Sequence, residues 1–220
     1  DGSMIRLTIA RYYTPSGRCI QKPYDKTANP DGTLSGEDNQ EKYNQALIDR
    51  FNHGELMHAD SIHFPDSLKY QTKKLARTVY GGGGIMPDFF VPIDTTQYTD
   101  YHRNIVAKGV VIKTTMKFIE SHRKELQSKY KKFETFNDKF EISDEILANM
   151  QTLAEQEKIK FDEKQYRKSL PLIKTQLKAL IARNLWDMNE YFQIMNTTDS
   201  CVLQALKVLN EGAYEKVVRL

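Results

Sequence analysis

The spacing of apolar residues changes near residue 94, and this change constrains the fold more than any other feature of the chain. Before it, apolar residues alternate with polar ones or form short runs between glycines and prolines, which is typical of strands and turns. After it, apolar residues recur three, four or seven positions apart, as on one face of a helix. We therefore predict an α+β chain, with a small β-rich part over residues 1–93 and a mainly α-helical domain over residues 94–220.

Strand patterns dominate the first part. In residues 4–13, Ile5, Leu7 and Ile9 alternate with Arg6, Thr8 and Ala10, which predicts a half-buried strand. The turn formers of "TPSG" follow at residues 14–17 and predict that the chain returns in a second short strand, "RCIQ". Further strand signals lie at "LARTVY" (75–80) and "DFFVPI" (88–93), while residues 25–76 form an insertion with a polar loop, a short helix and an irregular stretch.

Several helices are predicted beyond residue 94, with polar residues placed to cap them. Ser143 and Asp162 each precede an apolar-periodic segment, and Thr198 with Asp199 opens the last one. Pro171 is expected to kink or restart its helix, and Gly212 to end the final one. The residues expected to face inward are Tyr101, Ile105, Ile112, Met116, Ile119, Phe133, Phe136, Phe140, Ile146, Leu147, Met150, Leu153, Ala154, Ile173, Leu177, Leu180, Ile181, Leu185, Trp186, Phe192, Met195, Val202, Leu203, Leu206 and Leu209.

Four consecutive glycines, Gly81–Gly84, need a physical reason, because glycine loses more backbone entropy on folding than any other residue. A phosphate-binding loop would place Lys and Ser or Thr after the last glycine, whereas Ile85, Met86 and Pro87 follow here. An oxyanion loop of the HGGG type would have His where Tyr80 stands, and the chain lacks G-x-S-x-G. We therefore expect the glycines to serve close backbone approach or a positive φ.

Composition indicates neither a nucleic-acid binder nor a metal protein. The 32 basic and 29 acidic residues give a net charge of only +3, and they are interleaved as on solvated helix faces. Cys19 and Cys201 are far apart and neither belongs to a CxxC pair, so no zinc site or disulfide framework is indicated. No apolar run has the length of a membrane span. No cofactor is expected.

No convincing catalytic set emerges from the residues themselves. His53, His58 and His63 recur every five positions, but consecutive imidazoles would diverge on a helix, and Gly54 and Pro65 favour a loop. The pattern S-x-x-K occurs at Ser121 and Ser128 within a strongly charged segment that faces water.

Two motifs together resemble the C-terminal processing, or tail-specific, serine peptidases. These are "LTIARYYTPSGRCIQ" over residues 7–21 and "GIMPDFFV" over residues 84–91, in the order found in that family. The long helical tail is similar to the C-terminal extension of the large Bacteroides-type members. The signature residues are Tyr12, Tyr13, Thr14, Pro15, Ser16, Gly17, Arg18, Gly84, Ile85, Pro87 and Asp88.

The resemblance implies a Ser/Lys dyad that lies before Asp1, so no catalytic residue is expected within this chain. Lys108 in "AKGVVI" imitates the family's lysine motif, but it follows the P-D segment, and Ile112 stands where the motif has Gln. Ser16 is expected to be a turn residue. The family also implies an upstream PDZ domain that captures substrate C-termini, and a periplasmic or cell-envelope location. The chain would then be an inactive C-terminal part of a peptidase.

Two other functions remain open from the sequence. The helical region could be a non-catalytic module that binds a partner protein, and the pI of about 8.7 leaves a nucleic-acid binder as a third hypothesis. We also expect self-association of the chain through the strand at residues 4–13, because an unpaired strand edge recruits another strand.

Overall fold

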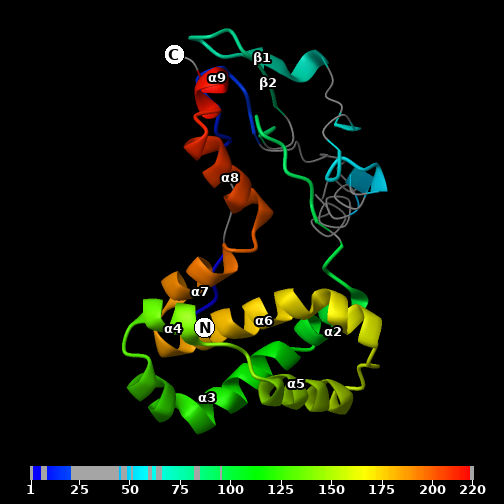
Figure 1. The fold of residues 1–220 in the computed structure, drawn as a ribbon. Coiled ribbons are helices and arrows are strands. Elements are labelled where there is room, and N and C mark those ends of the chain that lie inside the picture. Colours follow the sequence, from blue (N-terminus) through cyan, green and yellow to red (C-terminus); the bar gives the residue numbers. More distant parts are fainter. Residues whose placement is uncertain are drawn as a thin grey trace. The chain divides into compact units, whose positions relative to one another are not determined.

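A computed structural model describes residues 2–5, 9–20, 45, 49–50, 52–58, 61–62, 66–81, 85–94 and 96–218. The chain forms two compact units, residues 1–93 with 213–220 and residues 94–212 (Figure 1). Most described elements are helices, and one small antiparallel sheet is present among them, which is an α+β composition. The assignment of residues 1–93 to a peptidase core and of 94–220 to an extension stays a prediction.

A short β-hairpin organises the described part of the first unit. Strand β1 (Lys69–Gln71) pairs antiparallel with β2 (Thr78–Tyr80), with Tyr70 opposite Val79. A 3-10 helix, η2 (Asp66–Leu68), precedes the hairpin, and the short helix α9 (Tyr214–Val218) belongs to the same unit. The strand predicted at residues 75–80 is thus confirmed at 78–80. Its partner β1 was missed, because it lies in a stretch interpreted as irregular.

The strand predicted at residues 4–13 is wrong for the residues that are described there. Residues 4–5 and 9–12 have no regular structure, and Ile5 and Ile9 are 92% and 89% exposed. Alternation favours a strand only where another strand and a core receive it. Among the described residues, one isolated bridge, between Tyr13 and Cys19, remains of the expected pair. The strand edge on which we based self-association is therefore not found among these residues.

The turn between the two expected strands is confirmed. Gly17 N donates to Thr14 O at 2.8 Å, and Thr14 N donates to Arg18 O at 2.9 Å. Gly17 has a φ of +83°, a conformation that favours glycine. The hydroxyls of Thr14 and Ser16 lie 2.9 Å apart, so Ser16 is a turn residue, as expected.

The final strand expected at residues 88–93 is also wrong. Residues 88–89 form a bend, and residues 90–93 have no regular structure. Pro92 has no N–H to give to a neighbouring strand, and the segment's attachment includes a bond of 3.1 Å from Ile93 N to Leu56 O. The polar loop at 25–36, most of the expected short helix and Gly82–Gly84 lie outside the described residues, although 45, 49–50 and 52 are helical.

Within the described residues, the second unit consists of seven helices. They are α2 (Asp100–Ala107), α3 (Val110–Lys129), α4 (Phe133–Lys139), α5 (Asp144–Gln156), α6 (Glu163–Leu185), α7 (Met188–Met195) and α8 (Ser200–Asn210). The predicted caps are confirmed, because Ser143, Asp162 and Asp199 accept bonds from backbone N–H groups in the first turns of α5, α6 and α8. Gly212 follows α8 with a φ of +62°.

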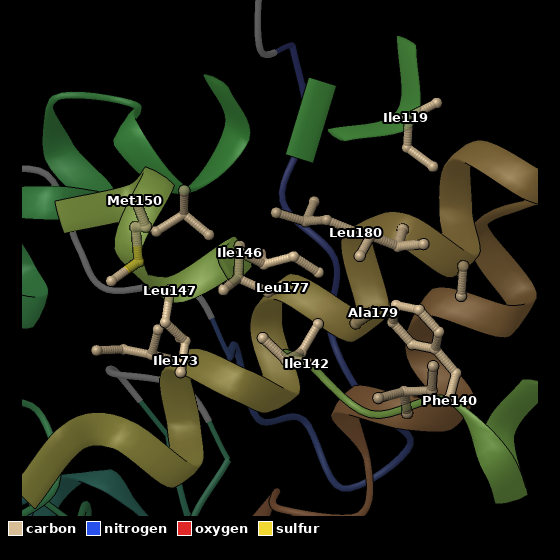
Figure 2. Close-up of a cluster of buried hydrophobic side chains, with 14 of the residues drawn as sticks. Ile119, Phe140, Ile142, Ile146, Leu147, Met150, Ile173, Leu177, Ala179 and Leu180 are labelled. Atoms are coloured by element: carbon tan, nitrogen blue, oxygen red, sulfur yellow. The ribbon is translucent and has the colours of Figure 1, made fainter. Parts of the chain in front are cut away.

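Helix α6 is the centre of this unit and contacts α2, α3 and α7, while α3 also contacts α5 (Figure 1). Ile173, Leu177 and Ile181 of α6 are fully buried. Figure 2 shows Leu177 and Ile173 beside Ile146, Leu147 and Ile142. An aromatic cluster closes one end of the core, with ring contacts among Tyr130, Phe133, Phe136, Phe140 and Trp186.

Two expected core residues, Ile112 and Met116, are 51% and 46% exposed. The prediction treated residues 101–119 as one helical face, but Gly109 separates α2 from α3 with a φ of +69°. The break shifts the phase of the apolar stripe. Buried residues after it are Val110, Val111, Thr114, Thr115, Ile119 and Leu126.

Pro171 does not restart a helix, since α6 runs without interruption from Glu163 to Leu185. The stripe that was expected to continue into residue 195 divides instead, because Asp187 caps α7 through a capping box with Glu190. Phe192 of α7 is 51% exposed, contrary to expectation.

The apolar residues of α8 are also misassigned as inward. Leu203, Leu206 and Leu209 are 48%, 51% and 60% exposed, and Val208 is the buried residue of this helix. Among the described helices, none shares extensive contacts with α8. No described helix is both long and apolar enough to cross a membrane.

Candidate functional site

The first signature segment lies against the β-hairpin. Arg18 Nη1 donates to Tyr80 O at 3.3 Å. Gly81 is buried, and a Cβ at this position would lie 3.1 Å from both Cys19 O and Tyr70 Cε2. Any larger residue would push on the backbone of the signature segment. The expected close backbone approach is therefore confirmed at Gly81.

The second signature segment is attached to the same hairpin. Asp88 forms an ion pair with Arg77, which stands directly before β2. Residues from both signature motifs thus meet strand β2 of one hairpin, Arg18 at the end of the strand and Asp88 beside its start. Arg18 Nε is buried and has no hydrogen-bond partner among the described residues.

The other described signature residues offer little chemistry. Tyr12, Tyr13 and Ile85 are 85%, 63% and 63% exposed, and Pro87 is exposed as well. Pro15 lies within the turn, and Gly84 lies outside the described residues. No nucleophile with a neighbouring base appears among the described residues of these segments.

Lys108 lies at the C-terminal end of α2 and makes a structural contact. Its Nζ donates to Glu157 O at 2.5 Å, while Lys113 Nζ bonds Glu157 Oε1 at 2.6 Å. The hydrogen bond from Lys113 lowers the pKa of Glu157. Both lysines therefore bind the C-terminal end of α5, where the helix dipole favours cations.

The histidines and serines singled out from the sequence form no site in the described part of the chain. His53 and His58 lie in a turn region, His63 is not described, and no group of three or more potential metal ligands occurs among the described residues. Cys19 and Cys201 are free thiols. Ser121 and Ser128 are exposed, and Ser121 Oγ donates to Lys117 O at 3.4 Å.

A partly buried polar network joins the start of α2 to α6, and sequence reasoning missed it. The hydroxyls of Thr99 and Ser169 lie 2.8 Å apart, and Ser169 donates to Gln97 O at 2.6 Å. Gln165 Oε1 accepts from Tyr101 N at 2.8 Å. These groups are about 70 positions apart in sequence, so no local pattern reveals them.

His102 and Tyr101 are buried beside this network. His102 Nε2 lies 3.1 Å from Gln176 Oε1, and its Nδ1 has no partner among the described residues. Burial lowers the pKa of His102, and the bond with Gln176 opposes the shift. Burial, with the nearby Tyr166 and Glu155, raises the pKa of Tyr101 to about 12. Both groups are therefore neutral at pH 7.

Pockets open between helices of the helical unit. One, of about 400 Å³, lies between the α4–α5 connection, α6 and the end of α7. Another, of about 200 Å³, lies between α3 and α5. His122 lines the smaller pocket, with Nδ1 3.0 Å from Phe118 O and its ring stacked on that of Phe118.

Residues 101–187 match a family model described as a family of unknown function (DUF8443). The match begins in α2 and ends directly after α6, so it covers less than half of the chain and leaves out the hairpin, α7 and α8. No curated protein matches the chain, and no solved structure does.

Proposed function

We propose that the chain is the C-terminal portion of a serine endopeptidase of the C-terminal processing type, which degrades or processes proteins from their C-termini. The observation that carries this proposal is the meeting of both signature segments on one hairpin. Arg18 bonds Tyr80 O, Cys19 O lies against Gly81, and Asp88 pairs with Arg77. A peptidase core assembled from these segments needs such contacts to bring together two motifs more than 60 residues apart.

The chemistry of the proposed parent enzyme lies outside this chain. Resemblance places the serine nucleophile and the lysine base before Asp1. Burial would keep that lysine neutral, so that it could take the proton of the serine during acyl transfer. The described Ser16 and Lys108 make structural contacts instead. The chain alone is therefore proposed to be inactive, and the parent to act in the periplasm or cell envelope.

The test compares the isolated chain with a longer protein that includes the sequence encoded before Asp1. We expect that a fluorophosphonate labels the longer protein, which cleaves casein, and that it does not label the isolated chain. In the longer protein, Gly81→Val is expected to lower cleavage strongly, because the side chain would collide with Cys19 O. Lys73→Ala, at an exposed position of the hairpin turn, is the matched control.

Two results would contradict the proposal. One is turnover by the isolated chain that survives Ser16→Ala and Lys108→Ala, since the catalytic group would then lie elsewhere within residues 1–220. The other is a longer protein that neither reacts with the fluorophosphonate nor cleaves casein.

A non-catalytic interaction module is the second candidate. The exposed leucines of α8, Leu203, Leu206 and Leu209, favour it, because an apolar stripe on a helix is a common means of binding a partner. Under this hypothesis, the longer protein remains inert towards the fluorophosphonate, and Leu206→Lys abolishes capture of a partner without changing the melting of the chain.

A further inference from the structure

The pocket between the α4–α5 connection, α6 and the end of α7 combines apolar and cationic groups in a way that the proposed peptidase does not use. It is called the lysine pocket below. Its volume of about 400 Å³ lies within the range of small-molecule sites. It is lined by Asn137, Phe140, Glu141, Ile142, Lys174, Thr175, Lys178, Ile194 and Thr197.

Apolar side chains form the inner surface of the lysine pocket. Phe140, Ile142 and Ile194 are 8%, 6% and 3% exposed, so they belong to the packed core and present a rigid wall. Figure 2 shows Phe140 and Ile142 at the edge of the buried cluster. A ligand with an apolar group can cover this wall and displace water from it.

Lys178 is already satisfied by the protein. Its Nζ donates to Asn137 O at 2.7 Å, where the carbonyl belongs to the last turn of α4. Burial lowers the pKa of Lys178, while the carboxylates of Glu141 and Asp138 oppose the shift. The charge of this lysine is therefore balanced by a carbonyl and two acidic neighbours.

Lys174 has no such balance. It precedes Lys178 by four positions on α6, so both side chains lie on the same face of the helix, where like charges repel. It is half-buried, and it forms no hydrogen bond or ion pair within the described part of the chain. Because a cation that is partly withdrawn from water is stabilised by an anionic partner, Lys174 is suited to bind an anion.

The hydroxyl groups of the pocket do not compete for an anion. Thr175 Oγ1 donates to Pro171 O at 3.0 Å, and Thr197 Oγ1 donates to Ile194 O at 2.7 Å. Their protons are therefore engaged by the backbone. Glu141 lies exposed at the rim of the pocket, and its carboxylate repels anions. This repulsion is weaker for a ligand with a single negative charge than for one with several.

From these features we propose that the lysine pocket binds a small monocarboxylate with an apolar body, whose carboxylate pairs with Lys174 and whose apolar group lies on Phe140, Ile142 and Ile194. The group can come from a free aliphatic acid or from the C-terminal residue of a peptide. The site is independent of the peptidase proposal, because it lies wholly within residues 137–197.

The experiment uses the whole 220-residue chain and follows backbone amide signals by NMR during titration with hexanoate. We expect saturable shifts at Phe140–Ile142, Thr175 and Thr197. Hexanol and inorganic phosphate are the matched probes, since one lacks the charge and the other lacks the apolar group. N-acetyl-leucine and hexanoate distinguish the two sources: tighter binding of N-acetyl-leucine indicates a peptide end, and the reverse order indicates a free acid. The amide of N-acetyl-leucine lacks the carboxylate and should bind more weakly than the acid.

Three variants of α6 locate the charge. Lys174→Met is expected to weaken hexanoate binding about ten- to a hundredfold, the loss typical of a hydrogen bond to a charged group. Lys174→Arg keeps the charge and should stay within about threefold of the unchanged chain. Lys168→Met removes an exposed lysine of the same helix outside the pocket and should have no effect.

The proposal is overturned by any of three results. If hexanol bound as tightly as hexanoate, the carboxylate would contribute nothing to binding and the pocket would recognise only the apolar group. Phosphate shifting the same amides while hexanoate does not would indicate a simple anion site. Equal effects of Lys174→Met and Lys168→Met, with all variants folded by their amide spectra, would remove Lys174 from the site.

Discussion

Helices α6 and α8 begin in the same way and differ in what becomes of their apolar residues. Each follows an aspartate whose carboxylate accepts from first-turn N–H groups, Asp162 for α6 and Asp199 for α8. Each carries leucines at helical spacing. Yet Leu177 of α6 is fully buried, whereas Leu206 of α8 is 51% exposed.

The difference teaches that periodicity and capping specify a helix but do not specify its burial. Helix α6 is surrounded by α2, α3 and α7, which together cover its apolar face. Helix α8 has no comparable neighbour among the described helices, so the same type of face stays in water. Four predictions test this comparison.

The largest effect is expected for Leu177→Ala in α6. Because the side chain is fully buried, its removal should leave a cavity and lower the free energy of unfolding by about 2–5 kcal/mol. Denaturant melts followed by circular dichroism measure the change. A melt that superimposes on that of the unchanged chain would mean that α6 is not the core helix.

The second effect is a pH dependence of the free energy of unfolding that comes from the packing around α6. It should be smaller than the effect of Leu177→Ala, because a single proton is involved. His102 contacts Gln176 of α6, and its folded pKa is lowered by burial. The unfolded chain therefore binds the proton first, so stability is full above the unfolded pKa of about 6.5 and is lost as the pH falls through the folded pKa.

His102→Gln is expected to flatten this dependence between neutral and mildly acidic pH. Urea melts at a series of pH values measure it, with His122→Gln as the control at a half-buried histidine of the same unit. Equal slopes in the unchanged chain and in His102→Gln would show that His102 does not titrate on unfolding.

Loss of an N-cap gives the third effect. Asp199→Ala removes the acceptor for Cys201 N and Val202 N, and should destabilise α8 locally by about 1 kcal/mol. Hydrogen exchange should accelerate at the first amides of α8 while α6 is unaffected. Asp162→Ala is the matched change on α6. Because the core surrounds α6, this variant should lower the free energy of global unfolding without accelerating local hydrogen exchange at the start of the helix.

The smallest effect is expected for Leu206→Ala. An exposed leucine exchanged for another good helix former should change the free energy of unfolding by no more than about 0.5 kcal/mol. The same melts as for Leu177→Ala measure it. A loss comparable with that of Leu177→Ala would mean that α8 is covered in solution.

Local interactions were the part of the fold that could be predicted from the sequence. Ser143, Asp162 and Asp199 cap their helices through bonds to residues no more than three positions away, and the turn at Thr14–Gly17 closes within four residues. Both partners of each of these contacts lie within a few residues of one another, so a short stretch of sequence is enough to predict them. The close approach at Gly81 was one of two roles expected for the four glycines, beside a positive φ, because a run of glycines marks places where a side chain does not fit.

Features that depend on distant partners were predicted poorly. The strand predicted at residues 4–13 is wrong for the residues described there, because its alternation requires a neighbouring strand. Strand β1 was missed because three residues carry almost no pattern. The exposed Ile112 and Met116 follow from the helix break at Gly109, a signal that was present in "AKG". The lysine pocket draws its walls from residues 137–197, and sequence spacing does not reveal such a hollow.

The left-handed conformation of Gly109 sets the length limit of the helical unit. A single straight helix from Asp100 to Lys129 would extend about 45 Å at about 1.5 Å per residue, well beyond the 30 Å or so of a small domain. Gly109 allows the chain to change direction between the two helices. Helix α3, about 30 Å long, then packs along the bundle, while α2 runs in another direction and contacts α6.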